Sequence, residues 1–269
     1  MGKKWKYEDI PDQTGKTVIV TGANSGLGYE VAKMLARKGA RVIMACRNLE
    51  KAEAAKAKIL GEYPKLLLEI MKLDLSDLSS VRDFVKEFSA KYQSLDILCN
   101  NAGVMFPPRG KTVDGFELQL GTNHFGHFAL TGLLLDIINK TDNSRIVTMS
   151  SFGHTYGKMD FNDLNWEKTK YNKLKAYGRS KLANLLFGYE LQRRLEASGS
   201  KTMSNVSHPG WTRTNLQRNA FMFRMLNPIL AQKPGMGALP MLFGATALEA
   251  EGGAYYGPDG MLGWTGYPI

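Results

Sequence analysis

Short apolar runs alternate along the chain with longer segments in which apolar residues recur every three or four positions. The runs have the length and the often β-branched character of buried strands, and they lie at 17–20, 41–45, 66–73, 95–99, 145–149 and 203–207. The longer segments predict helices at 27–38, 49–60, 81–88, 112–140 and 174–198. Strands that alternate with helices indicate βαβ units, so we expect an α/β fold with a doubly wound parallel sheet.

No linker or change of composition divides the chain, which predicts a single domain over residues 1–269. Residues 1–13 form a polar arm ahead of the first strand. Residues 211–240 are rich in Met, Phe, Pro and Gly and have weak periodicity, so we expect a mobile lid of short helices over a substrate. Large apolar side chains in this lid favour a lipophilic substrate, and they are Phe221, Met222, Phe223, Met225 and Leu226.

The chain is basic and poor in cysteine. Its net charge of +10 favours anionic partners, nucleotide phosphates among them, without selecting one. Cys46 and Cys99 fit a reducing compartment, and we expect no disulfide between them because their strands flank the first strand on opposite sides. The apolar stretch 125–138 is too short and mixed to span a bilayer, and no secretory signal is visible, which predicts a cytoplasmic protein. The basic segment 5–7 leaves room only for weak contact with anionic lipid.

A glycine-rich loop follows the first predicted strand, at the end of a parallel sheet where ligands bind. Its pattern over Thr21–Gly28 is T-G-x-x-x-G-x-G. Glycines permit a tight strand-to-helix turn and let backbone N–H groups approach a pyrophosphate at the helix N-terminus. The loop therefore predicts dinucleotide contacts from Gly22, Asn24, Ser25, Gly26, Leu27 and Gly28.

The end of the second predicted strand bears on which dinucleotide binds. This strand ends in Ala45-Cys46-Arg47-Asn48, without the carboxylate that usually binds the ribose 2′-hydroxyl of NAD. The planar guanidinium of Arg47 can instead pair with a 2′-phosphate. We therefore expect NADP(H) to be preferred, with NAD(H) left open, and contacts from Arg47 and Asn48.

The spacing Y-x-x-x-K places a phenol and an ammonium one turn apart on the same face of a helix. It occurs three times in the chain, at Tyr29/Lys33, Tyr171/Lys175 and Tyr177/Lys181. Tyr29 directly follows the glycine-rich loop, and Tyr171 precedes the expected helix, so we favour Tyr177 and Lys181. We expect the ammonium and the charge of an oxidised nicotinamide to lower the pKa of Tyr177 and suit it to acid–base catalysis.

In this order the motifs resemble those of the short-chain dehydrogenase/reductase family over about residues 14–260. The resemblance implies one Rossmann-like domain with about seven strands and a small substrate lid near the C-terminus. It also implies a catalytic tetrad in which Tyr177 exchanges a proton, Ser151 binds the substrate oxygen, and Asn123 anchors a water near Lys181. Further cofactor contacts implied by the family are Asp74 and Leu75 at the adenine, Asn101, Ala102 and Gly103 at the ribose, and Pro209, Gly210, Thr212 and Thr214 at the nicotinamide and phosphates.

Four segments resemble one branch of the family, which includes retinol dehydrogenases, WW-domain oxidoreductase and protochlorophyllide reductases. They are T-G-A-N-S-G, A-C-R-N, N-H-F-G-H-F and H-P-G. The branch implies hydride transfer between nicotinamide and a carbonyl or alcohol carbon of a lipophilic small molecule. Reduction of a C=C bond and a non-catalytic NADP(H)-binding scaffold are the alternatives, and a homo-oligomer stays open.

Two other functions receive little support from the sequence. His124 and His127 are three positions apart, but no further ligands accompany them, so we expect core or cofactor-adjacent histidines and no metal site. No helix-turn-helix, zinc finger or aromatic-basic array indicates nucleic-acid binding.

Overall fold

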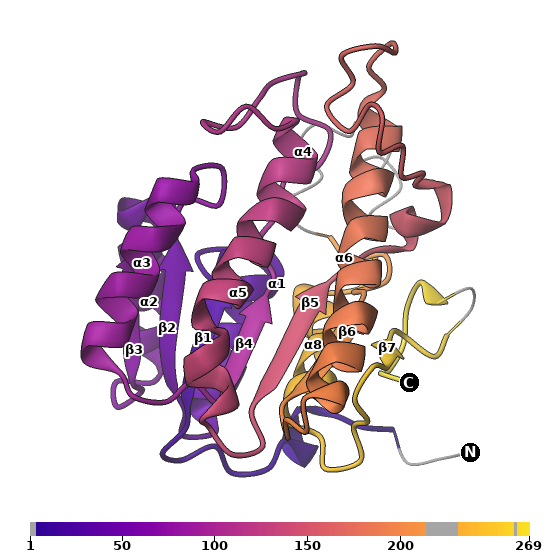
Figure 1. Ribbon diagram of the computed structural model, residues 1–269. Coiled ribbons are helices and arrows are strands. Elements are labelled where there is room, and N and C mark those ends of the chain that lie inside the picture. The colour runs from indigo at the N-terminus through magenta and orange to yellow at the C-terminus, as the bar shows by residue number, and fades with distance from the viewer. Residues whose placement is uncertain (1–3, 214–230, 261–262) are drawn as a thin grey trace.

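The structure is a computed structural model that describes residues 4–213, 231–260 and 263–269. Its centre is a parallel sheet with the strand order β3-β2-β1-β4-β5-β6-β7 (Figure 1). The strands are β1 Thr17–Thr21, β2 Arg41–Cys46, β3 Leu68–Lys72, β4 Ile97–Asn100, β5 Arg145–Met149, β6 Met203–Ser207 and β7 Tyr255–Tyr256. This is the doubly wound α/β fold that the alternating pattern predicts.

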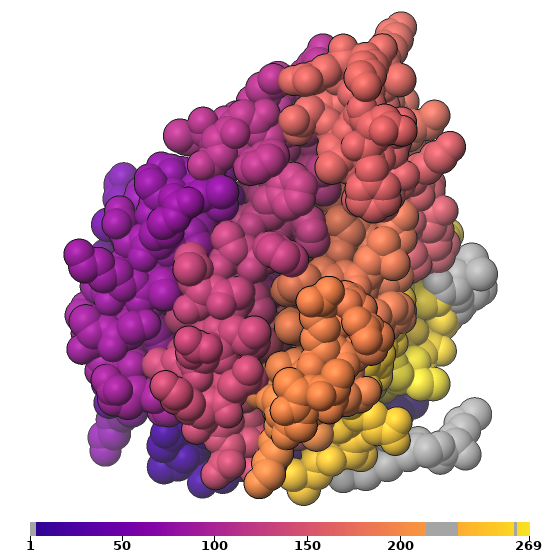
Figure 2. Space-filling model, in the orientation of Figure 1, coloured from indigo at the N-terminus to yellow at the C-terminus, as the bar shows by residue number. Residues whose placement is uncertain are grey.

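Helices cover both faces of the sheet. One face is covered by α1 Gly26–Arg37, α2 Leu49–Glu62 and α8 Pro234–Thr246, and the other by α3 Leu78–Lys91, α5 Gly126–Asn139 and α6 Lys173–Ala197. Figure 2 shows the molecule from the side of α3, α5 and α6, whose side chains form a continuous surface over the strands. Short elements complete the described chain: η1 Tyr7–Asp9, α4 Leu118–Leu120, the π-helix η2 Gly121–Phe125 and η3 Phe152–Tyr156.

Burial on both faces explains why the strands are apolar runs rather than alternating ones. All of β1 is buried, with Val18 and Val20 in the core beneath α1 and α8, and Ile19 in the core beneath α3 and α5. At the carboxyl ends of the strands the chain turns into loops, so the predicted site residues that follow β1, β4, β5 and β6 gather along one edge of the sheet.

Three expectations change in the structure. The N-terminal arm is not a free polar segment, because Trp5 is buried and packs edge-on against Phe243 of α8 at 5.3 Å between ring centroids. The predicted lid at 211–240 includes the start of α8, and from Pro234 onward the chain belongs to the layer that packs on α1 and the sheet. Residues 214–230, with Thr214 and the apolar lid residues, lie outside the described part of the chain. The helix predicted from 112 begins only at Leu118, with a π-turn before α5.

The two cysteines lie where the sequence places them. Cys46 ends β2 and Cys99 is in β4, on opposite sides of β1, and both are buried free thiols.

Candidate active site

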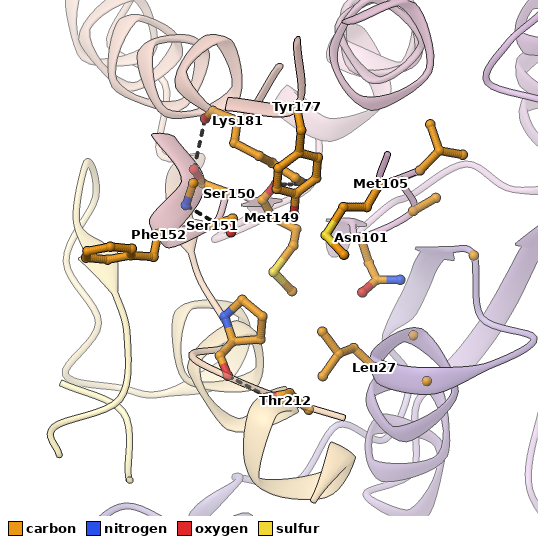
Figure 3. A pocket seen from close by; sticks show the side chains of 18 of the residues that line it. Leu27, Asn101, Met105, Met149, Ser150, Ser151, Phe152, Tyr177, Lys181 and Thr212 are labelled. Atoms are coloured by element: carbon orange, nitrogen blue, oxygen red, sulfur yellow. Dashed lines mark hydrogen bonds between the residues drawn. The ribbon is translucent and has the colours of Figure 1, made fainter. Parts of the chain in front are cut away.

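A cavity of about 560 Å³ runs along the carboxyl ends of the strands, from the glycine-rich loop to the N-terminal half of α6 (Figure 3). Most of the predicted site residues line it: Gly22, Asn24, Ser25, Gly26, Leu27, Gly28, Arg47, Asn101, Ala102, Gly103, Ser151, Tyr177, Lys181, Pro209, Gly210 and Thr212. A second cavity of about 710 Å³ shares the loop and Arg47 and adds the predicted contacts Asn48, Asp74 and Leu75. The fold therefore brings together residues spread over nearly two hundred positions.

The glycine-rich loop makes a close passage between β1 and α1. Gly22 and Gly26 have φ angles of +68° and +58°, which favour glycine. At Gly28 a Cβ atom would lie within 2.5 Å of the carbonyl oxygen of Gly22 and of the side-chain amide of Asn101. The first turn of α1 therefore packs directly against the loop and Asn101, and the loop and this turn line the cavity.

Thr21 joins the glycine-rich loop to the segment after β4. Its hydroxyl oxygen accepts hydrogen bonds from the backbone N–H groups of Asn101 and Ala102, both at 2.9 Å, and its carbonyl oxygen accepts one from the Asn101 amide at 2.8 Å. His127 contacts the same hydroxyl through Nε2 at 2.9 Å, and its Nδ1 donates to the carbonyl oxygen of Asn123. Burial lowers the pKa of His127 to about 4, so the ring is a neutral structural link between Thr21 and Asn123.

The predicted acid–base pair lies on α6, one turn apart. Asn172 caps this helix by accepting from the backbone N–H groups of Leu174 and Lys175, which places the start of α6 after Tyr171. Tyr177 and Lys181 are both buried, and Lys181 Nζ donates to the carbonyl oxygen of Met149 at 3.0 Å. Lys181 Nζ lies 5.8 Å from the centre of the Tyr177 ring, so the two side chains face the cavity together (Figure 3).

In the protein without cofactor, burial outweighs the expected lowering of the Tyr177 pKa by the Lys181 ammonium. Burial raises this pKa above its ordinary value of 10, and a hydrogen bond with Ser151 opposes the rise only in part. Burial also lowers the pKa of Lys181 from 10.5 to about 8, because the ammonium is taken out of water. The protein therefore keeps Tyr177 as a neutral phenol, a form that can donate a proton.

The end of β5 brings two serines to α6 in different roles. Ser150 Oγ donates to the carbonyl oxygen of Lys181 at 2.9 Å and is also hydrogen-bonded to the Tyr255 hydroxyl. Ser151 Oγ accepts from the N–H of Gly153 at 3.1 Å and lines the cavity beside Tyr177. Glycine at position 153 lets the loop after β5 pack closely against Tyr177, since a Cβ atom there would lie 3.1 Å from the Tyr177 ring.

Asn123 lies in the π-helix behind the cavity rather than on its wall. Its side chain exchanges two hydrogen bonds with Val104, accepting from the N–H at 2.7 Å and donating to the carbonyl at 3.0 Å, and it donates to Ser180 Oγ at 2.9 Å. A Cβ atom on Gly103 would lie 3.1 Å from Asn123 Oδ1 and 3.8 Å from Lys181 Nζ. Asn123 is thus the one member of the predicted tetrad that does not line this cavity, and its side chain fixes the segment after β4.

Comparison with known proteins places this geometry in a family. The sequence model for short chain dehydrogenases matches residues 16–224. The chain belongs to the short-chain dehydrogenase family. It is 47% identical to human retinol dehydrogenase 13 over 244 residues, covering 87% of this chain and 73% of the relative, which confirms the predicted resemblance to the retinol dehydrogenase branch.

Solved structures of other proteins agree with the fold. A crystal structure of an uncharacterised protein from Mycobacterium paratuberculosis matches with a TM-score of 0.83 and 43% identity, over 99% of this chain and 88% of that chain. A short chain dehydrogenase from Escherichia coli CFT073, solved as a complex with NADPH, matches with a TM-score of 0.72 and 25% identity, over 92% of this chain and 97% of that chain.

Sequence reasoning missed the apolar wall of this short-chain dehydrogenase's cavity. Its residues are Met105, Phe106, Pro107, Met149, Phe152, Tyr156, Trp211 and Trp264. Phe106 packs edge-on against Tyr177 at 5.4 Å and has a φ angle of +54°, unusual for a bulky residue. The aromatic residues that follow Gly103 and Ser151 in the sequence could have indicated this wall. Trp264 could not, because it comes from the C-terminal segment, whose path the sequence pattern does not reveal.

Two kinds of feature are absent from the described residues. Within 4–213, 231–260 and 263–269, no group of three or more His, Cys, Asp or Glu side chains is arranged to hold a metal ion. In the same part of the chain, no helix is both long and apolar enough to cross a membrane.

Proposed function

We propose that this short-chain dehydrogenase is an NADP(H)-dependent oxidoreductase that transfers hydride between nicotinamide and a carbonyl or alcohol carbon of a lipophilic small molecule. One observation carries the proposal. The hydroxyls of Tyr177 and Ser151 meet an apolar wall in the same cavity that begins at the glycine-rich loop. We infer that this cavity receives the nicotinamide end of a dinucleotide next to an apolar carbonyl compound.

The residues present fit a nicotinamide dinucleotide. Gly28 packs so closely against Gly22 and Asn101 that there is no room for a side chain, and both cavities open onto the glycine-rich loop, which supports a dinucleotide contact there. We assign Gly22–Gly28 to the pyrophosphate, Arg47 and Asn48 to the 2′-phosphate, and Asp74 and Leu75 to the adenine. Asn101, Ala102, Gly103, Pro209, Gly210 and Thr212 would hold the ribose and the nicotinamide.

The preference for NADP(H) rests on charge at the end of β2. Arg47 lines both cavities, and the neighbouring residues Cys46 and Asn48 carry no carboxylate that would repel a phosphate. The Escherichia coli relative that was solved with NADPH supports the same choice. The retinol dehydrogenase relatives and the apolar wall support a lipophilic substrate.

The chain's own groups supply proton transfer and orientation. When bound, the cofactor supplies or accepts the hydride. In the reduction of a carbonyl, the neutral Tyr177 phenol donates its proton to the substrate oxygen, and Ser151 Oγ orients that oxygen by a hydrogen bond. In the oxidation of an alcohol, Tyr177 would first have to lose its own proton before it could accept the one from the substrate hydroxyl, and the positive charge of an oxidised nicotinamide would favour that loss. Lys181 holds the end of β5 through the carbonyl oxygen of Met149 and places a positive charge near the phenol.

The proposal is tested with a panel of lipophilic and polar aldehydes and ketones, with turnover followed by nicotinamide absorbance. NADPH and NADH are compared in parallel, and Tyr177→Phe is the control for background oxidation. We expect turnover of lipophilic carbonyls with NADPH, and little with NADH or with the variant. Equal use of NADH would contradict the assignment of Arg47, and turnover of the polar compounds alone would contradict the apolar wall.

A further inference from the structure

Tyr255 packs between the rings of two histidines, one of them from the segment that follows Ser150 and Ser151, and it lines neither cavity. The ring of His154, from η3, meets Tyr255 edge-on at 5.4 Å and 90°, and the ring of His208 stacks on it at 5.1 Å and 24°. His154 follows β5, His208 follows β6, and Tyr255 opens β7. One phenol ring therefore joins the carboxyl ends of two strands to the start of a third.

Hydrogen bonds link these rings to the backbone of Ser151 and Lys181. His154 Nδ1 lies 2.7 Å from the carbonyl oxygen of Ser151, which can only accept, so Nδ1 carries the proton. The same N–H lies 3.3 Å from the Tyr255 hydroxyl oxygen. The Tyr255 hydroxyl bonds to Ser150, whose own proton goes to the carbonyl oxygen of Lys181 at 2.9 Å (Figure 3). Each group thus donates to the next: His154 to Tyr255, Tyr255 to Ser150, and Ser150 to the carbonyl oxygen of Lys181.

This chain of bonds fixes the backbone on both sides of the Ser151 hydroxyl. Before it, Ser150 is tied to α6, and after it, His154 closes the turn in which Ser151 Oγ accepts from Gly153. On the other side of Tyr255, His208 Nδ1 accepts from the N–H of Gly210, which lines the cavity. Phe152 and Tyr156 of η3 face the cavity, whereas His154 does not line it.

We propose that His154 and Tyr255 are positioning residues that hold the Ser151 hydroxyl in reach of the Tyr177 phenol. The inference rests on the proposed function, because it assigns Ser151 to the substrate oxygen. Positioning residues of this kind affect the rate of the chemical step more than they affect binding, since the group that they hold acts on the reacting atoms.

The experiment compares variants in which the side-chain hydrogen-bond donor at position 154 or 255 is kept, displaced or removed. In His154→Asn the amide N–H lies close to the position of Nδ1, whereas in His154→Gln it lies farther along the side chain and cannot replace it. Tyr255→Phe keeps the ring and removes the hydroxyl. Its matched control is Tyr256→Phe in the same strand, because the Tyr256 hydroxyl bonds only to the backbone of Glu251 among the described partners.

We expect His154→Gln and Tyr255→Phe to lower kcat about tenfold, the effect of one lost hydrogen bond on an oriented group, with KM and NADPH affinity unchanged. His154→Asn and Tyr256→Phe should keep kcat within about twofold of the wild type. Equal kcat in the two His154 variants, or in the two tyrosine variants, would overturn the inference.

A failure of the proposed function gives a different result. If the wild type turns over no carbonyl compound, amide hydrogen exchange over residues 150–157 decides the inference by itself. Faster exchange in His154→Gln and Tyr255→Phe than in their partner variants supports a loop held by these side chains. Identical exchange in all four variants would contradict it.

Discussion

Lys181 is a buried lysine whose neighbours are backbone carbonyl and amide groups rather than a carboxylate. It is 3% exposed, and Nζ donates to the carbonyl oxygen of Met149. Burial lowers its pKa from 10.5 to about 8, which costs the folded state about 3 kcal/mol at neutral pH. We therefore expect Lys181→Met, which removes the charge and nearly keeps the volume, to stabilise the protein.

The net gain is smaller than the removed penalty. The variant loses the hydrogen bond from Nζ to Met149, worth about 1 kcal/mol, while that carbonyl oxygen keeps the amide of Asn184 as a donor at 3.0 Å. We expect the free energy of unfolding at pH 7 to rise by about 2 kcal/mol. The same variant should lose turnover, because the charge near Tyr177 is gone, so stability and activity move in opposite directions.

The effect has a defined pH dependence. The pKa of Lys181 is about 8 in the folded protein and near its ordinary 10.5 in the unfolded chain, so the unfolded chain binds more protons between these values. The penalty is therefore complete below pH 8 and fades as the pH rises to 10.5. Urea unfolding followed by circular dichroism should show the gap between variant and wild type narrowing to less than about 1 kcal/mol at pH 10.

Two results would refute this reasoning. One is a Lys181→Met variant that is less stable than the wild type at pH 7, which would mean that the ammonium is stabilised in the fold. The other is a stability gap that stays constant from pH 7 to pH 10, which would mean that the pKa of Lys181 is not lowered.

Three further substitutions test separate parts of the site. Tyr177→Phe should lower kcat by about 10²- to 10⁴-fold and leave NADPH affinity unchanged in a fluorescence titration, because only the proton donor is removed. Arg47→Asp should weaken NADPH binding at least about tenfold and leave NADH binding unchanged, since a carboxylate repels the 2′-phosphate. Gly28→Ala should destabilise the fold by about 1–3 kcal/mol in thermal or urea unfolding, because its Cβ meets the Gly22 carbonyl, while the control Gly61→Ala has open space around it.

Each of these substitutions has an outcome that counts against its premise. A Tyr177→Phe variant with wild-type kcat would remove the phenol from the chemistry. Equal loss of NADPH and NADH affinity in Arg47→Asp would show that the guanidinium does not read the 2′-phosphate. Equal stability of the two glycine variants would mean that the passage between β1 and α1 has room for a methyl group.

The strands were the part of the fold most accessible to sequence reasoning. β5 and β6 begin and end at the predicted residues, 145–149 and 203–207, because apolar runs buried on both faces contrast sharply with their flanks. The family resemblance implied about seven strands, but the position of β7 was not predicted, since Tyr255–Tyr256 is too short to show a period. The helix predicted from 112 starts late because the backbones of Lys111 and Glu117 form an isolated antiparallel β-bridge across a turn instead.

In the site, too, features set by local sequence could be predicted, whereas features set by tertiary packing could not. Motifs within a single loop or helix turn, such as Gly22–Gly28 and the Tyr177–Lys181 pair, could be read directly because local spacing determines their geometry. The pKa of Tyr177 could not, because it depends on burial by residues distant in sequence. Trp264 and Tyr255 also reach the site region only through tertiary packing of the C-terminal segment.

The position of the substrate oxygen is the central assignment of the proposed mechanism. A crystal structure with NADPH and an unreactive lipophilic ketone analogue measures this position directly. We predict the ketone oxygen within about 3.2 Å of both the Tyr177 hydroxyl and Ser151 Oγ. An oxygen bound elsewhere in the cavity, out of hydrogen-bonding reach of the Tyr177 phenol, would contradict the assignment of Tyr177 as the proton donor.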